Sequence, residues 1–173
     1  VPADKWQTFR LPFLPNWHTF SLPETPIHVF DHAPLTGDAI LNACDKLMSG
    51  SQLKVLFVDP IELMEPSSEQ NELEQLRTLK FIAKKLCITV VAAARVPRHV
   101  EERANMRPKL RDLNSDFADV IAFLFREEYY EPDTDLRGVA ELIIARHRLG
   151  PTGTIELIRE GSTGRFRNRV TGY

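Results

Sequence analysis

The sequence contains little cysteine and carries almost no net charge. Its 173 residues include two cysteines, and 22 Lys and Arg nearly balance 24 Asp and Glu, which leaves a formal net charge of −2. Cys44 and Cys87 lack the spacing of metal ligands, and both are predicted to be small buried hydrophobic residues. The balanced charge excludes a global positive field, so any contact with nucleic acid must come from a local basic patch.

Long apolar runs and a phosphate-binding motif are absent as well. No run of about 18 apolar residues occurs, and the N-terminus lacks the charged-then-apolar order of a secretory signal, which predicts a cytoplasmic protein without a membrane span. No G-x-x-x-x-G-K-[ST] motif occurs, so the backbone cradle and lysine that hold phosphates in many nucleotide-binding proteins are missing. The chain begins at Val1 rather than methionine, and we expect a fragment or a processed form.

The two ends of the chain differ in composition from its middle. Residues 1–26 hold five of the twelve prolines, which predicts an irregular lead-in. Residues 161–173 are Gly-rich and basic, and we expect a flexible tail there. The hydrophobic content of 43% suffices for a core, so a single domain over residues 1–173 is predicted.

Three continuous apolar runs predict strands. Because their apolar residues do not alternate with polar ones, the strands are expected to be buried on both faces of a parallel sheet. The runs are KVLFVD (54–59), CITVVAAA (87–94) and DVIAFLF (119–125).

The segments around these runs predict helices. We expect a short strand at 27–31, then a helix with Thr36 as its N-cap that Gly50 ends. A second amphipathic helix, capped by Ser67 or Ser68, is expected between the first two runs. Alternating strands and helices predict right-handed crossovers and a parallel α/β fold.

The C-terminal third has a different pattern. AELIIARHR (140–148), a turn at 150–153 and TIELIRE (154–160) predict an antiparallel hairpin. This order suits a RecA-like core, and we expect an α/β fold with a mostly parallel sheet flanked by helices and a C-terminal antiparallel hairpin.

Three stretches carry a resemblance to a known family: VLFVDPIELM (55–64), RPKLRDL (107–113) leading to ADVIAFLFREEYY (118–130), and GVAELIIARHRLGPTGTIEL (138–157). Taken together, they resemble the C-terminal RecA-like motor domain of the DnaB-type replicative helicases. Residues 26–47 match the same family, so the resemblance covers nearly the whole chain. It implies a hexameric ring that binds ATP and Mg²⁺ between neighbouring subunits and carries single-stranded DNA through its channel, with primase or a helicase loader as partners.

Asp59 ends the first apolar run, where the open edge of an α/β sheet places ligand-binding groups. On the residues alone, a turn-opening aspartate before Pro60 is the commoner interpretation. The resemblance implies instead the Walker B aspartate, which orients Mg²⁺ through its waters beside the phosphates. Pro60 and Glu62 stand where the family usually has tyrosine and glutamine.

Arg146 and Arg148 are spaced i, i+2, so on a strand both point to one face and can address one anion together. Paired arginines on a hairpin are more often solvated surface residues. The resemblance implies that Arg148 is the finger that reaches the ATP of the neighbouring subunit, and Arg146 stands where the family usually has lysine. Both are therefore predicted to be catalytic and ATP-binding residues.

The stretch after the second apolar run departs from the family. Arg95 occupies the place of a glutamine that senses the γ-phosphate, and arginine cannot accept a hydrogen bond from an attacking water. Arg98, Arg103 and Arg107 are the predicted DNA-binding residues, although charges at such spacing equally form surface ion pairs. Residues 114–117 replace a longer loop that contacts DNA phosphates in the family, which weakens the expectation of DNA binding.

Two functions remain open from the sequence. The first is part of an ATP-dependent replicative DNA helicase, and the second is a catalytically degenerate relative that associates with a helicase or its loader. A third, another RecA-fold ATPase such as a recombinase, is disfavoured by the tyrosine pair at 129–130 and the GPTGT turn. Without a phosphate loop and the catalytic glutamate beyond it, the chain should not hydrolyse ATP alone.

Overall fold

The computed structural model describes residues 27, 28, 30, 35–50, 53–65, 71–113 and 116–169. The chain divides into two compact units, Val1–Ala33 and Pro34–Tyr173, and the helices and strands of the described residues all lie in the second. The expected lead-in at 1–26 and the expected cap at Ser67 or Ser68 lie outside the described residues. Ile27, His28 and Phe30 are described, and none of them is in a strand, so the prediction of a strand at 27–31 is wrong at these positions.

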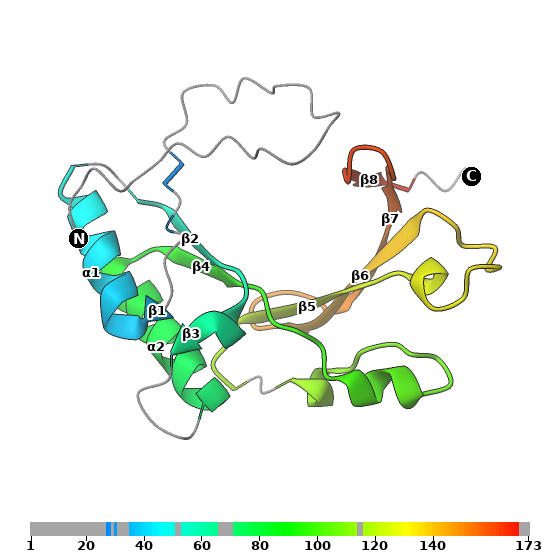
Figure 1. The fold of residues 1–173 in the computed structure, drawn as a ribbon, viewed down its shortest axis with the longest axis horizontal. Coiled ribbons are helices and arrows are strands. Elements are labelled where there is room, and N and C mark those ends of the chain that lie inside the picture. Colours follow the sequence, from blue (N-terminus) through cyan, green and yellow to red (C-terminus); the bar gives the residue numbers. More distant parts are fainter. Residues whose placement is uncertain are drawn as a thin grey trace. The chain divides into compact units, whose positions relative to one another are not determined.

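The second unit combines parallel and antiparallel strand pairing. Strand β1 pairs with β3 and β2 pairs with β4, both in parallel, whereas β5, β6, β7 and β8 form one antiparallel sheet in that order. The predicted α/β class with C-terminal antiparallel strands is confirmed. The elements are β1 (Leu35–Thr36), α1 (Gly37–Met48), β2 (Val55–Val58), η2 (Ile61–Leu63), β3 (Met64–Glu65), α2 (Asn71–Leu86), β4 (Thr89–Ala92), η3 (Arg98–Glu102), η4 (Leu110–Asp112), β5 (Val120–Phe125), η5 (Glu127–Tyr129), β6 (Val139–His147), β7 (Gly153–Arg159) and β8 (Phe166–Asn168) (Figure 1).

Helix α1 begins where the sequence predicts. The Thr36 hydroxyl oxygen accepts a hydrogen bond from the Ala39 N–H at 3.2 Å, which satisfies one of the free donors of the first turn. Asp38 in the first turn and Lys46 in the last complement the helix dipole. The helix ends at Met48, just before the expected stop at Gly50.

The core lies between the two helices and one face of the β2–β4 pair. Both helices lie on the same side of these strands (Figure 1). Ile61 and Ile82 are almost completely buried there, and burying such a side chain stabilises the fold by about 1.5–3 kcal/mol. The other members of this core cluster are Ile40, Cys44, Val58, Met64, Leu79, Leu86 and Ile88.

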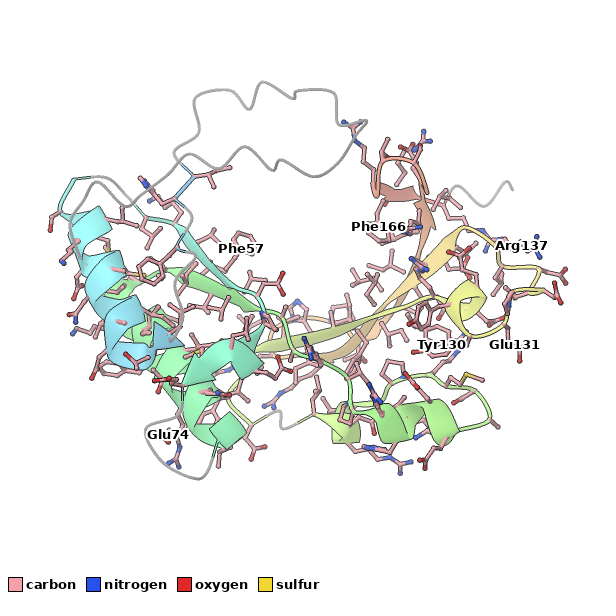
Figure 2. All side chains as sticks on the ribbon, in the orientation of Figure 1. Phe57, Glu74, Tyr130, Glu131, Arg137 and Phe166 are labelled. Carbon is pink, nitrogen blue, oxygen red and sulfur yellow. The ribbon has the colours of Figure 1, made fainter. Side chains whose placement is uncertain are left out.

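The opposite face of the β2–β4 pair is bare in the described part of the chain. Phe57 is 72% exposed, and its register partner Val91 is also exposed on the same face. Phe57 projects from β2 away from α1 and α2 (Figure 2). The prediction that runs 54–59 and 87–94 are buried on both faces is therefore wrong, because the described helices cover one face only.

The two cysteines have different surroundings. Cys44 is buried in the core as predicted, and burial raises the pKa of its thiol. Cys87 is exposed, so the prediction that it is buried is wrong. It lies between α2 and β4 with φ of +53°, where the chain turns sharply between two buried neighbours, Leu86 and Ile88, and directs this residue outward.

The antiparallel sheet confirms the predicted hairpin and corrects one strand. Pairing of β6 with β7 runs from Val139 opposite Ile158 to Ile144 opposite Gly153. Strand β5 alternates between buried and exposed residues rather than being buried throughout, because it belongs to an antiparallel sheet with one covered face. Strand β8 lies inside the segment for which a flexible tail was expected.

The bare face generates a testable prediction. Replacing Phe57 by Ser should lower the binding of an apolar fluorescent dye and the tendency to aggregate, because an exposed apolar face attracts both. The free energy of unfolding should change by less than about 1 kcal/mol, as expected of an exposed position. Ile82→Ala is the matched control from the covered face and should cost about 2–5 kcal/mol in urea unfolding. Equal losses for the two variants would show that Phe57 is covered.

Candidate functional site

Asp59 lies directly beyond the C-terminal end of β2. In the parallel pair, Val58 is opposite Ala92, so β2 and β4 end at the same edge. The Ile61 N–H donates to the Ala93 carbonyl at 2.9 Å and ties the segment after Asp59 to the end of β4. Asp59 is exposed and makes no ion pair or hydrogen bond with the described residues. This edge therefore presents a carboxylate whose oxygens are open to a ligand.

Glu62 and Arg95 meet at the same edge. The Arg95 N–H donates to a Glu62 carboxylate oxygen at 2.7 Å, which joins the loops that follow β2 and β4. Both residues are exposed, and none of the described residues pairs with the Arg95 guanidinium. The sequence located Arg95 at this edge, but nothing in it indicated that Glu62 fixes the Arg95 backbone.

Arg146 and Arg148 lie near one end of β6. Arg146 is within the strand, opposite Ile121, and is half-buried. Arg148 lies one residue beyond the strand end at His147, and its side chain is 68% exposed. The prediction that both arginines lie on one strand is therefore correct for Arg146 only. The position of Arg148 depends on contacts outside the strand.

Those contacts come from Asp119, just before β5. The Arg148 N–H donates to the Asp119 carbonyl oxygen at 2.8 Å, and its Nη1 donates to Oδ1 of the Asp119 carboxylate at 3.1 Å. The ammonium group of Lys80, from α2, pairs with the other carboxylate oxygen, Oδ2. Lys80 first, and Arg148 second, lower the pKa of the Asp119 carboxyl below its usual value. This cluster joins α2, β5 and the end of β6.

Sequence reasoning missed this cluster. The signal available for Asp119 was its position directly before an apolar strand. Nothing in the sequence linked it to Arg148. Lys80 had no signal at all, because 39 residues separate it from Asp119.

Two of the three predicted DNA-binding arginines make ion pairs with buried carboxylates. Arg103 Nη1 donates to Asp112 at 2.7 Å, Nη2 contacts the second oxygen, and Asp112 is only 7% exposed. Arg107 donates to both oxygens of Glu141 at 2.6 Å, and Glu141 is 5% exposed. Arg103 holds η3 to η4, and Arg107 holds this region to β6.

Arg98 differs from these two. It is exposed at the start of η3, and its side chain makes no ion pair with any residue that the structure describes. Of the three, Arg98 is therefore the one whose guanidinium remains open to an external phosphate. The DNA-binding role of all three stays a prediction.

Two surface hollows lie away from Asp59 and Arg148. Two adjacent depressions, of about 390 and 220 Å³, share Met106, Phe125 and Tyr130. Neither is lined by Asp59 or Arg148. Within the described ranges, no three His, Cys, Asp or Glu residues form a group that could hold a metal ion, and no helix is long and apolar enough to cross a membrane. Asp59 is therefore not part of such a cluster in the described part of the chain.

Comparison with known proteins gives these features a context. The model of the DnaB-like helicase C terminal domain matches residues 16–168 of this chain. The chain belongs to the DnaB-like helicase C-terminal domain family. The resemblance and the RecA-like fold predicted from the sequence are confirmed by this match and by the solved structures described next.

Relatives of this DnaB-like chain are replicative helicases. DnaB of Buchnera aphidicola subsp. Acyrthosiphon pisum is 34% identical over 158 residues, which are 85% of this chain and 34% of that protein. DnaC of Bacillus subtilis is 31% identical over 159 residues, which are 86% of this chain and 35% of that protein. The chain thus spans about a third of the length of these curated relatives.

Solved structures agree with these matches. A structure of a DnaB-like replicative helicase and its interactions with primase superposes with a TM-score of 0.75 at 30% identity, covering 82% of this chain and 37% of that one. A solved ATPase domain superposes with a TM-score of 0.76 at 30% identity, covering 82% of this chain and 54% of that one.

The DnaB-like family implies the use of a nucleotide and Mg²⁺, and the residues present fit part of such a site. The open carboxylate of Asp59 suits a magnesium ion held through its waters. The exposed guanidinium of Arg148 suits a phosphate. The motif that cradles phosphates is absent from the 173 residues.

The buried pair of Arg103 and Asp112 makes the response to acid testable. Arg103 lowers the pKa of Asp112 far below its unfolded value near 4. The charge of Asp112 therefore stabilises the fold fully above about pH 4, and this contribution is lost as the pH falls further. Asp112→Asn should lower the urea midpoint at pH 7, and the difference from the unchanged chain should shrink at pH 3.

Asp133→Asn is the control for this experiment. Asp133 is fully exposed in its pair with Arg137, so its substitution should leave the midpoint almost unchanged at both pH values. A deficit of Asp112→Asn that is equally large at pH 3 and pH 7 would contradict the assignment.

Proposed function

We propose that this chain is the C-terminal part of an ATP-dependent replicative DNA helicase, in which it supplies one carboxylate and one arginine to ATP sites between subunits. The observation that carries the proposal is Asp59, an open carboxylate at the shared end of β2 and β4 in a chain of the DnaB-like family. The sequence also allowed a degenerate, non-catalytic relative. The comparisons do not favour that alternative, because the relatives are replicative helicases.

Asp59 is proposed to act on the metal side of the site. When bound, Mg²⁺ with ATP supplies a phosphoryl group whose charge the metal screens. Asp59 would accept hydrogen bonds from waters of the ion and so orient it. The Ile61 to Ala93 hydrogen bond fixes the loop behind Asp59, so the carboxylate stays at the edge of the sheet.

Arg148 is proposed to act on the ATP of a neighbouring subunit. A guanidinium has five N–H donors, and the Asp119 carboxylate occupies one of them, at Nη1. The remaining donors can bind a phosphate of the neighbour and stabilise its developing charge. A residue that acts across an interface in this way fits repeated head-to-tail contacts, which form a ring when the rotation between subunits closes. A hexamer is the ring that we propose, with Arg146 as a second cation near the phosphates.

The DNA and protein partners belong to the same proposal. Single-stranded DNA would meet exposed cations, of which Arg98 is the clearest. Arg103 and Arg107 would reach DNA only by sharing donors with Asp112 and Glu141. Primase is the protein partner that we propose, because a similar solved helicase was determined with its interactions with primase.

Loss-of-function substitutions test the two central residues. In the helicase assembly that contains this chain, Asp59→Asn should abolish Mg²⁺-dependent ATP hydrolysis measured with single-stranded DNA. Arg148→Ala should lower the rate by about 10³-fold or more, the scale of an arginine finger. Arg137→Ala, on the loop between η5 and β6 (Figure 2), is the control and should leave the rate unchanged. Wild-type rates for both test variants would refute the proposal.

Mixed assemblies test whether Arg148 acts across the interface. Asp59→Asn subunits and Arg148→Ala subunits should each be inactive alone. In a mixture, an Arg148→Ala subunit with its own Asp59 can receive Arg148 from an Asp59→Asn neighbour, so part of the ATPase activity should return. If no activity returns at any mixing ratio although mixed rings form, Arg148 acts within its own subunit.

A further inference from the structure

We infer that Asp119 is a positioning residue for Arg148 and that Lys80 anchors it to the core, an inference that rests on the proposed role of Arg148. Of the residues proposed to meet ATP and Mg²⁺, Asp119 contacts Arg148. Its contacts show how a residue in an exposed loop can be held in one direction.

Asp119 holds Arg148 at two points. Its carbonyl oxygen accepts the Arg148 N–H at 2.8 Å, and its carboxylate accepts Nη1 at 3.1 Å. The last register pair of β5 and β6 at this end joins Val120 and His147. Beyond it, the chain enters a loop in which Leu149 is 93% exposed. The backbone bond therefore fixes where Arg148 leaves the sheet, and the carboxylate fixes the direction of its side chain.

The geometry leaves Arg148 available for a ligand. Oδ1 of Asp119 faces Arg148, whereas Oδ2 faces Lys80, so the carboxylate contacts one nitrogen of the guanidinium rather than two. A bidentate pair, such as that of Arg107 with Glu141, occupies the two parallel N–H donors with which arginine binds oxyanions. Because Lys80 pairs with Oδ2, the carboxylate does not form a bidentate pair with Arg148, and the other N–H donors of the guanidinium stay available.

Lys80 connects this arrangement to a rigid part of the fold. It lies on α2 beside Leu79 and two residues before Ile82, both of which are buried in the core cluster. The position of the Asp119 carboxylate is therefore fixed by the packed helix α2 as well as by its own loop. Because bringing a catalytic group into place in advance reduces what must be ordered during reaction, a fixed Arg148 should raise the rate.

The exposure of the cluster separates this role from a structural one. Asp119 and Arg148 are 53% and 68% exposed, and ion pairs this exposed contribute little to stability. A purely structural role predicts that substitution of Asp119 has only small effects on both the catalytic rate and stability. A positioning role predicts a large effect on the catalytic rate with a small effect on stability.

The experiment measures ATP hydrolysis and thermal unfolding of the helicase assembly that contains this chain. Asp119→Ala should lower kcat at least tenfold, with KM for ATP and the melting temperature nearly unchanged. Asp119→Asn, which keeps an oxygen acceptor without the charge, should show a smaller loss. Asp133→Asn removes an exposed carboxylate elsewhere and should match the unchanged protein.

The decisive comparison adds Asp119→Ala to Arg148→Ala. If Asp119 acts through Arg148, the double variant should be no slower than Arg148→Ala alone in a sensitive radiolabel assay. A further loss in the double variant, or wild-type kcat for Asp119→Ala, overturns the positioning role. An unchanged rate for Arg148→Ala overturns the finger assignment, and the inference with it. A strong loss for Arg148→Ala alone leaves the proposed function intact whichever way Asp119 behaves.

Discussion

The packing of α1 and α2 against one face of the β2–β4 pair is the constraint on which the described structure depends. Val58 is buried in this contact, so the residue after it, Asp59, emerges at a fixed edge of the strands. The same contact buries Leu79 and Ile82, which orients α2 and brings Lys80 to Asp119. One apolar cluster thus sets the position of a carboxylate at one place and of an arginine at another.

The arginines of this chain differ according to the burial of their partners. Arg103 and Arg107 pair with carboxylates that have little access to water, and a buried charge that loses its partner is costly. These two residues therefore hold together the region between η3 and β6. Arg148 pairs with an exposed carboxylate through one nitrogen, so it can exchange or share its partner at low cost. Residue type alone does not distinguish these roles.

The features that depend on neighbouring residues in the chain, such as a helix cap and a hairpin, could be predicted from the sequence. Thr36 caps α1 because a hydroxyl three residues before a free N–H acts within one turn, and the hairpin follows from its turn residues. The exposure of Phe57 and Cys87 could not be predicted, because it depends on which elements cover a face or where a chain turns. The same holds for the site. The position of Asp59 at a strand end was predicted from the sequence, whereas the contact of Asp119 with Arg148 joins residues 29 apart.

The contrast between buried and exposed ion pairs also determines how ionic strength acts on the molecule. Dissolved ions screen charges in water over about 8–10 Å at physiological salt but penetrate the interior poorly. The Arg103–Asp112 and Arg107–Glu141 contacts should persist in concentrated salt, whereas the hold of Asp119 on Arg148 should weaken. Salt would then allow the Arg148 side chain to adopt more orientations while the fold around it stays intact. Under the proposed function, a loss of turnover in concentrated salt would therefore begin inside the protein, before any contact with a nucleic acid is released.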